Sequence, residues 1–421
     1  MTHPAAITSR SMFVRVAMPF LLLLASTISL HATASVIHSF LGGTDGSTPG
    51  TSLVFDTAGN LYGATQVGGN PACSHGCGTV FELSPATGGG WTESVIYTFQ
   101  GGGAGDGANP IGGLTIDAAG NLYGETLTGG THGCGTVYRL APGTSGWTET
   151  VLYGFCASGH NGDGSNPAGK VIFDSAGTLY GVTTLGGRNN TGVVYTLTPT
   201  TSGMWTQTVL YTFPATGGAL GNEPAGIIFD AAGTLWGVTT FGGTVAVNGS
   251  GVVFQLIKNT SGVWTQRVIK TFSTNAADVQ TPTGGMIFDA AGNLYMTMSR
   301  GAQGGASVFE LSPVTGGKYQ GHVLHAFQGP QVVQPYEALA FDSAGSLYSA
   351  SSVGGGACDC GLVYKLTPSG SSWLSTILLT MNGTSGNEPI GGVALDTAGD
   401  AFAATQFGGS KKVGVVLEFT P

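Results

Sequence analysis

Two segments of the sequence repeat a pattern of oxygen-bearing side chains of the kind that bind ligands or metal ions. The pattern Asp-Gly-x-Asn-Pro occurs at Asp106–Pro110 and again at Asp163–Pro167. Carboxylate and amide oxygens gathered on a turn are ligands that calcium accepts, which makes calcium at Asp106 and Asp163 one hypothesis. The alternative is structural, because Asp-Gly and Asn-Pro are ordinary turn formers and the spacing of a calcium-binding loop is absent.

The histidines of the chain are scattered among non-equivalent positions, and His132 and His160 fall in the same two repeats as these segments. The candidate residues of a ligand-binding face are therefore Asp106, Asn109, His132, His160, Asp163 and Asn166. No Ser-His-Asp or paired-carboxylate signature is visible in the sequence, although such groups can be assembled from distant loops. We therefore assign no catalytic residue.

Six cysteines are expected to form three disulfides if the protein is exported. Cys134 and Cys156 are equidistant from Ser145, the centre of a predicted hairpin, and are expected to pair across it. Local pairs are expected for Cys73 with Cys77 and for Cys358 with Cys360, the second closing a strained ring. The alternative for the first local pair is a zinc site made of Cys73, His75 and Cys77.

These residues must be held by a repeated scaffold. Seven copies of Asp-x-Ala-Gly begin at Asp56, Asp117, Asp174, Asp230, Asp289, Asp342 and Asp396. A period of this size, with strand-like segments inside each unit, predicts a propeller or solenoid. Within each copy the Asp accepts bonds from its own tight turn, so the seven aspartates are interpreted as structural.

Each repeat contains four predicted strands, a to d. In the second repeat they are 113–117, 121–126, 135–140 and 147–155. A large aromatic residue recurs in strand b, as at Tyr123, and another begins strand d, as at Trp147. We interpret both sets as packing between sheets; a ring of sugar-stacking aromatics is the alternative.

The last repeat lacks a strand d, and the segment Val36–Phe40 supplies one at the other end of the chain. Pairing it with the last strand c, near Val413–Phe419, would close a ring and remove a free edge. We therefore predict an all-β fold, a seven-bladed β-propeller of four-stranded blades over residues 35–421, closed by the N-terminal strand.

In such a ring the d-to-a and b-to-c connections share one face. These connections are long and varied at 68–77, 101–110, 156–167 and 241–250, whereas the a-to-b turns are short and uniform. Irregular loops on a rigid scaffold commonly carry function, so we assign ligand binding to this face.

Residues 1–34 are typical of a secretory signal peptide. Arg10 and Arg15 precede the apolar run Val16–Leu30, and Ala32-Thr-Ala34 fits a cleavage site; an uncleaved anchor is the alternative. We expect a secreted or periplasmic protein with no transmembrane span in the mature chain, acting as a monomer. The net charge of −9, with 13 scattered Lys and Arg, argues against nucleic acid as a partner.

The repeat resembles the GloVer tandem-repeat proteins, secreted bacterial proteins expected to be propellers. The resemblance is carried by Gly78–Pro85, Trp91-Thr-Glu, Val95–Phe99, Gly105–Pro110 and Asp117–Gly124, and extends over almost all of the mature chain. It implies the fold but no activity. Members of that family often end in a sorting anchor, which is not visible here, so the resemblance does not establish attachment to the cell surface.

From these observations we expect a non-enzymatic binding module for an extracellular glycan or a protein partner, without an obligatory cofactor other than the calcium considered above. The alternative is a secreted polysaccharide lyase or hydrolase using the same face around Asp106, Asp163, His132 and His160. A third hypothesis is a structural surface protein.

Overall fold

The computed structural model describes Met1 and residues 33–420, except 158–161, 216–217, 244–248, 274–279, 301–304 and 328–338. Residues Ala32–Pro421 form one compact unit, and the other unit, Met1–His31, is described only at Met1. Most of the predicted signal peptide and all of His160 lie outside the described residues.

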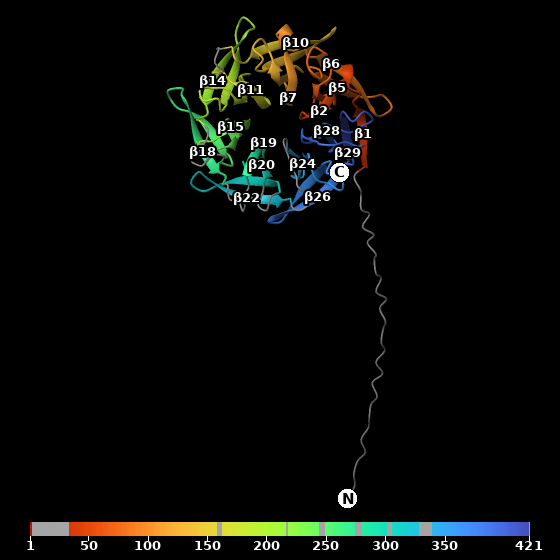
Figure 1. Cartoon of the computed structure of the whole chain (residues 1–421). Helices are drawn as coiled ribbons and strands as arrows, with labels where there is room; N and C mark the ends of the chain where they lie inside the picture. Colours follow the sequence, from red (N-terminus) through yellow and green to blue (C-terminus); the bar gives the residue numbers. More distant parts are fainter. Residues whose placement is uncertain are drawn as a thin grey trace. The chain divides into compact units, whose positions relative to one another are not determined.

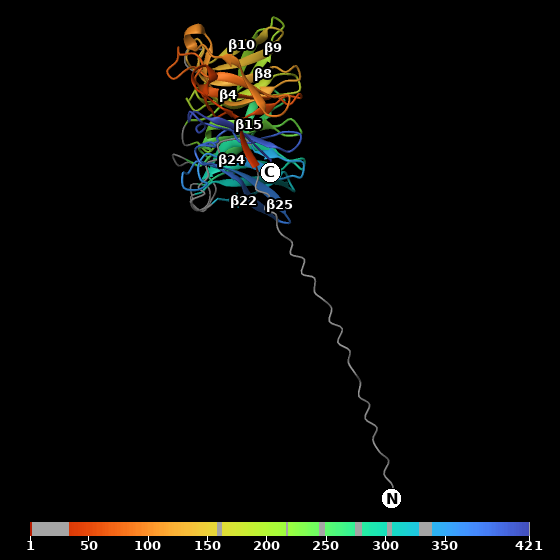
Figure 2. The same cartoon turned by 90° about the vertical axis from the view of Figure 1, so that its right-hand side faces the viewer.

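Seven antiparallel sheets are present in the described part of the chain, and they are arranged as the blades of a ring (Figure 1). Figure 2 shows the same ring from its side. Strand a of each blade lies near the centre and strand d at the rim, as β7 and β10 do. The predicted seven-bladed propeller is therefore confirmed.

The strands follow the repeats along the chain. Blade 1 contains β2 (Ser47–Pro49), β3 (Val54–Phe55), β4 (Leu61–Val67), β5 (Thr79–Pro85) and β6 (Trp91–Thr98). Blade 2 contains β7 (Gly107–Ile116), β8 (Leu122–Gly129), β9 (Thr136–Gly143) and β10 (Gly146–Gly154). Blade 3 contains β11 (Ser165–Phe173), β12 (Leu179–Leu185), β13 (Val193–Pro199) and β14 (Trp205–Thr212). Blade 4 contains β15 (Asn222–Phe229), β16 (Leu235–Phe241), β17 (Val252–Lys258) and β18 (Trp264–Thr271).

The remaining blades use the rest of the chain and its first strand. Blade 5 contains β19 (Gln280–Phe288), β20 (Leu294–Arg300), β21 (Ser307–Val314) and β22 (Lys318–Ala326). Blade 6 contains β23 (Ala340–Phe341), β24 (Leu347–Ser351), β25 (Leu362–Ser369) and β26 (Ser372–Thr380). Blade 7 contains β27 (Ala394–Leu395), β28 (Ala401–Thr405), β29 (Val415–Thr420) and β1 (Thr33–Ser39). Two 3-10 turns, η1 (Gly43–Asp45) and η2 (Gly102–Ala104), lie in d-to-a connections.

The ring is closed by the N-terminal strand, as predicted. Strand β1 pairs antiparallel with β29, with Val36 opposite Leu417 and His38 opposite Val416. Blade 7 therefore takes its strands from both ends of the described sequence, and the edge of β29 is covered.

The repeated aspartates fold the a-to-b turns. Asp117 Oδ1 accepts the backbone N–H groups of Ala119 and Asn121, each at 2.9 Å, and Oδ2 accepts the Tyr123 hydroxyl at 3.0 Å. All seven aspartates accept the same pair of backbone donors, which confirms their structural role.

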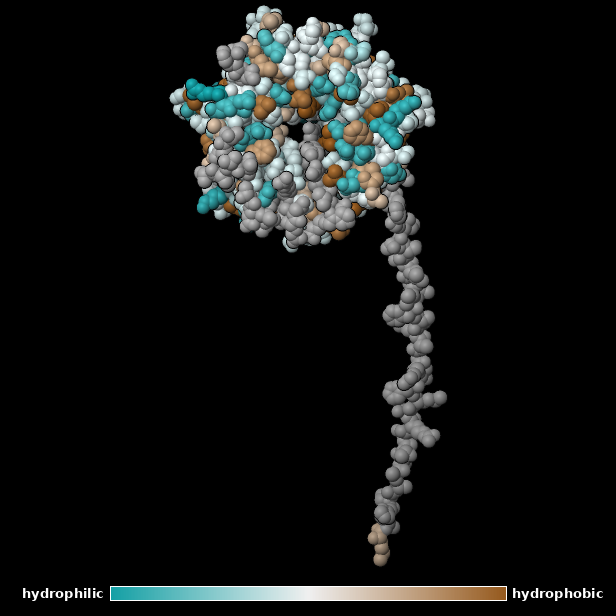
Figure 3. All heavy atoms as spheres, viewed as in Figure 1, coloured by the Kyte–Doolittle hydropathy of each residue, from teal (hydrophilic) through white to brown (hydrophobic). Residues whose placement is uncertain are grey.

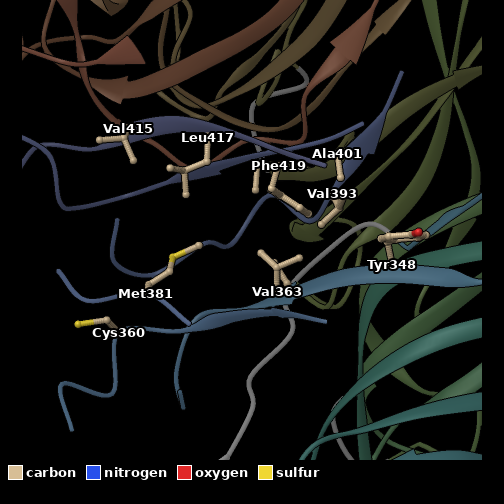
Figure 4. Packing of buried hydrophobic residues seen from close by; sticks show 11 residues of the cluster. Tyr348, Cys360, Val363, Met381, Val393, Ala401, Val415, Leu417 and Phe419 are labelled. Atoms are coloured by element: carbon tan, nitrogen blue, oxygen red, sulfur yellow. The ribbon is translucent and has the colours of Figure 1, made fainter. Parts of the chain in front are cut away.

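The strand-b aromatics form part of the core between blades, so the sugar-stacking alternative is wrong for them. Tyr62 is 4% exposed and packs edge-on against Trp147 of the next blade, with ring centroids 5.7 Å apart. Figure 4 shows the corresponding junction of blades 6 and 7, where Tyr348 and Val363 of blade 6 belong to one buried cluster with Leu417 and Phe419 of blade 7. Each sheet therefore buries its apolar surface against its neighbour.

A second contact joins neighbouring blades at the start of strand a. The Asn109 backbone N–H donates to the carbonyl of Cys77 in blade 1 at 2.8 Å. The ring of Pro110 packs against Gly78, where a Cβ would lie 2.4 Å from Pro110 Cδ. The same glycine and proline meet at 135/167, 192/224, 251/282, 361/389 and 414/49. Six described junctions thus require a residue without a side chain.

This contact makes a testable prediction. Gly135 has a φ of +93°, and a Cβ there would lie 2.3 Å from the Thr126 carbonyl oxygen and 2.7 Å from Pro167 Cδ. We expect Gly135→Ala to lower the free energy of unfolding by about 2 kcal/mol or more, because the backbone must shift to make room for the Cβ. This loss comes in addition to the cost of a positive φ for alanine. Urea denaturation followed by tryptophan fluorescence measures the loss.

Gly146→Ala is the matched control. Gly146 also has a positive φ, +114°, but no atom lies within 4 Å of its ideal Cβ position. It should show only the conformational cost of about 1 kcal/mol. Equal losses for the two variants would contradict the importance of the contact between blades.

Candidate functional site

The b-to-c and d-to-a connections lie at one end of the blades; we call this surface the loop face, and it includes residues 68–78, 99–106 and 130–135. Figure 3 shows the molecule in the view of Figure 1, with a hollow at the centre of the ring. The opposite surface, carrying the seven aspartate turns, we call the turn face.

All three expected disulfides are present, and all three lie in connections of the loop face. Cys73–Cys77 is in the β4–β5 connection, Cys134–Cys156 joins the β8–β9 connection to the end of β10, and Cys358–Cys360 is in the β24–β25 connection. The zinc alternative at Cys73, His75 and Cys77 is wrong, because its two thiolates are consumed by the disulfide.

The disulfides also hold the junctions between blades. The carbonyls of Cys77, Cys134 and Cys360 accept the N–H groups that begin the next blades, at 2.8, 3.1 and 2.9 Å. At the corresponding place after blade 3, Thr191 accepts such a bond and its hydroxyl donates to the Phe213 carbonyl at 2.9 Å. At this junction a side-chain hydrogen bond thus links the same two connections that a disulfide links after blade 2.

Asp106 and Asp163 are buried acceptors within their own connections. Asp106 Oδ2 accepts the Tyr97 hydroxyl at 2.8 Å and the Gln100 N–H at 2.7 Å, and Oδ1 accepts the Gly107 N–H. Asp163 Oδ2 accepts the Tyr153 hydroxyl at 2.6 Å and the Ala157 N–H at 3.0 Å. Calcium at these residues stays a prediction, and an ion would have to displace such donors.

Asn109 and Asn166 were expected in loops but lie in strands β7 and β11. Strand a starts at Gly107 in blade 2, six residues before the expected start at 113. Both asparagines have positive φ, 56° and 55°. Each immediately precedes the proline that packs against the previous blade, so their position follows from that contact.

His132 is exposed in the β8–β9 connection, and His160 lies outside the described residues. A further histidine, His75, lines a shallow cavity of about 280 Å³ together with Gly43, Ser47 and Pro71. The loop face therefore presents imidazole groups to solvent beside disulfide-bonded loops.

The central channel contains a cavity of about 290 Å³ lined by strand a of several blades. Ser52, Lys170 and Thr283 are polar residues of its wall, and Ile172, Ile227 and Leu339 contribute apolar surface. Lys170 is exposed. Glu337 lies outside the described residues.

Carboxylates that the sequence analysis did not single out occupy the junctions between blades. Glu149 is half-buried on β10, and burial together with the negative charge of Asp106 raises its pKa to about 7. In the next blade Gln207 takes this place, and its Nε2 donates to the Asp163 carbonyl at 3.1 Å. The sequence signal for this junction is the alignment of Trp147-Thr-Glu149 with Trp205-Thr-Gln207, which shows that Glu149 and Gln207 are equivalent.

Glu125 is the second carboxyl that was missed, and it is buried in β8 at 1% exposure. It accepts the hydroxyl of Tyr195 from blade 3, and burial raises its pKa well above the usual range. The other blades have no carboxyl at this position, which is Ala64, Val182, Val238, Thr297, Ala350 or Ala404. We interpret Glu125 as a neutral core acid joining two blades.

The environment of Glu149 predicts a pH-dependent stability. Its pKa rises from 4.5 in the unfolded chain to about 7 in the folded one, so stability present below pH 4.5 is lost as the pH rises through 7. We expect Glu149→Gln to stabilise the protein at pH 8 by about 1 kcal/mol, a value reduced because a half-exposed charge is screened. Urea denaturation at pH 4 and pH 8 measures it.

The reciprocal variant Gln207→Glu is the control, and it should destabilise the protein more at pH 8 than at pH 4. An equal gain from Glu149→Gln at both pH values would show that the carboxyl's ionisation is not responsible.

The sequence matches a family model described as the Gloeobacter/Verrucomicrobia repeat over residues 71–306 and 282–421. The two matches together span most of the chain. A search of curated proteins found no match.

Solved structures share the fold at low sequence identity. PorZ of Porphyromonas gingivalis, an essential bacterial surface component of the type-IX secretion system, is similar with a TM-score of 0.55 and 13% identity. The match covers 88% of this chain and 46% of PorZ, so the chain spans about half of that protein's length. A putative oxidoreductase (glucose dehydrogenase) from Thermus thermophilus has a TM-score of 0.44 and 15% identity, covering 92% of this chain and 100% of that one. The similarity to PorZ shows a shared fold and nothing more. The similarity to the putative oxidoreductase is too low to support any inference about this chain.

Among the described residues no helix has both the length and the apolar character needed to cross a membrane.

Proposed function

The chain belongs to the Gloeobacter/Verrucomicrobia repeat family, and we propose that it is an exported, non-enzymatic binding module that contacts an extracellular glycan or a protein partner through its loop face. In this proposal residues 1–34 are removed as a signal peptide. The mature propeller then acts as a monomer in the periplasm or outside the cell.

The observation that carries the proposal is the placement of the disulfides. All three fix connections of the loop face, and the turn face has none among the described residues. Structural disulfides persist in oxidising compartments, which supports export. Loops that are already rigid lose less conformational entropy when they bind, which supports recognition at this face.

The turn face is a poor candidate by comparison. Its seven turns share one backbone conformation, and their aspartates already accept two N–H groups each. The loop face differs from blade to blade in length, disulfides and exposed imidazoles. Specific recognition needs such variety on a constant scaffold.

The lyase or hydrolase alternative would need an acid or base that is available to substrate. Glu149, with its pKa near 7, is one carboxyl that fits that description. Its place is taken by Gln207 in blade 3, where the side chain makes a structural hydrogen bond. We therefore interpret the Glu149 position as part of a blade junction, not as a general acid.

An arginine scan of both faces tests the proposal. A labelled preparation of the oxidised protein is applied to an array of bacterial and plant glycans, and each hit is checked by the rise in thermal midpoint with the soluble oligosaccharide. Exposed loop-face positions to be changed to Arg are His75, His132 and Thr384, and the matched turn-face positions are Thr57, Ser175 and Thr397.

We expect at least one loop-face arginine to weaken binding of a hit tenfold or more and the turn-face set to leave it within twofold. Loss of binding only with the turn-face set would place the site on the wrong side of the ring for this proposal. New reducing ends released from a bound polysaccharide would establish the enzyme instead. An array without hits would contradict the glycan as ligand and leave the protein partner for capture experiments.

A further inference from the structure

A cluster of three metal-ligating side chains lies where the ring closes, away from the residues considered above. His38 is on β1, Asp45 ends η1, and Glu93 is on β6 of blade 1. One ligand atom from each lies within 4.8 Å of the other two, and all three residues are half-buried. Among the described residues, no other group of three His, Cys, Asp or Glu side chains brings its ligand atoms this close together.

The repeats show what this position contains when it has only a structural role. At the junction of blades 1 and 2 the corresponding residues are Tyr97, Asp106 and Glu149, and the tyrosine hydroxyl donates to the aspartate at 2.8 Å. At the junction of blades 2 and 3, Tyr153 donates to Asp163 at 2.6 Å. His38 is the histidine variant of this tyrosine, and like Tyr97 and Tyr153 it packs edge-on against the phenylalanine two residues later.

The histidine does not replace the tyrosine's hydrogen bond. His38 Nε2 lies 3.4 Å from Asp45 Oδ1, a distance that suits an ion pair, but the contact lacks hydrogen-bond geometry. The Nε2 atom is buried and has this ion-pair contact but no hydrogen bond, and Glu93 Oε1 is a buried atom without a hydrogen-bond partner in the described structure. Buried polar atoms are normally satisfied, so the cluster has unused capacity to bind a ligand.

The charges favour a cation between these atoms. Asp45 and Glu93 place two carboxylates beside one imidazole in a half-buried site, with one ligand atom of each group within 4.8 Å of the other two. A divalent cation would relieve the repulsion between the two carboxylates and bind all three groups.

We propose that His38, Asp45 and Glu93 form a three-ligand binding site for a divalent transition-metal ion, with zinc as the best fit, which ties the closing strand to blade 1. One imidazole nitrogen and two carboxylate oxygens are ligand types that zinc accepts, and three protein ligands leave a coordination position for water. Calcium and magnesium fit less well, because they prefer sets made of oxygen alone.

The position at the closure gives the ion a structural consequence. His38 belongs to blade 7 through β1, Glu93 belongs to blade 1, and Asp45 lies in the connection between them. An ion held by all three would bind the closed ring and not the open chain, and would therefore raise the thermal midpoint of unfolding.

Calorimetric titration with zinc chloride and thermal unfolding test the proposal. The purified chain, treated with EDTA and freed of any affinity tag, is compared with His38→Tyr and Glu93→Gln. His38→Tyr introduces the residue that strand d of blades 1 and 2 has, so it is expected to fold, and Glu93→Gln removes a ligand without changing its size. Glu149→Gln is the matched control, since the blade before it has tyrosine, Tyr97, in place of the histidine.

We expect the wild type and Glu149→Gln to bind one zinc ion more than His38→Tyr and Glu93→Gln. Zinc at about 100-fold its Kd should raise their thermal midpoint by about 3 °C or more and leave the two ligand variants unchanged. Cobalt substituted for zinc should show a visible d–d spectrum that His38→Tyr abolishes. Equal zinc stoichiometry in all four proteins, or no binding to the wild type, would overturn the proposal and leave His38 as a simple ion-pair partner of Asp45.

Discussion

The rest of the propeller depends on how each blade meets the next at the start of strand a. There the backbone N–H of the residue before a proline donates to a carbonyl of the preceding blade, and the proline ring packs against a glycine. The donors at the six described junctions are Thr48, Asn109, Asn166, Glu223, Thr281 and Glu388. All six have positive φ, between 54° and 60°. Such a conformation costs about 1–3 kcal/mol for a residue with a side chain, and it persists because the hydrogen bond and the packing over-determine it.

The same contact between blades also determines how the connections of the loop face are arranged. It joins the d-to-a connection of one blade to the b-to-c connection of the blade before, so the two kinds of connection form one continuous surface. Asp106 and Asp163 hold the ends of the d-to-a connections, and Cys77, Cys134 and Cys360 supply acceptors on the other side. The scaffold is therefore constant, and function is to be sought where the repeats differ from one another.

Much of this architecture could be predicted from the sequence, because its signals are local and repeated. Alignment of the seven repeats is enough to predict the aspartate turns and the recurring aromatic residues of strands b and d. It also predicts the last blade, which takes its strand d from the start of the chain. The pair Cys134–Cys156 follows from hairpin symmetry. Asn109 and Asn166 were expected in loops because Asp-Gly and Asn-Pro are ordinary turn formers. In the structure both lie in strands, since the proline that follows each of them packs against a glycine of the preceding blade.

The contacts that depend on ring closure could not be predicted in the same way. Asp45 and Glu93 are 48 positions apart, and their approach to His38 requires that β1 already covers β29. Glu125 meets Tyr195 only because neighbouring blades pack the middle strands of their sheets against one another. In both cases the useful sequence signal is a departure from the repeat: histidine in place of tyrosine, and glutamate in place of alanine, valine or threonine.

Amide hydrogen exchange of the six pre-proline residues tests the role of the blade junction most directly. If each N–H is held by the preceding blade, it should exchange as slowly as central strand amides such as those of Val80 and Val137, and only through global unfolding. Exchange as fast as that of the exposed turn residue Thr57, while the strands remain protected, would show that the blades are held together without this contact and would contradict the account.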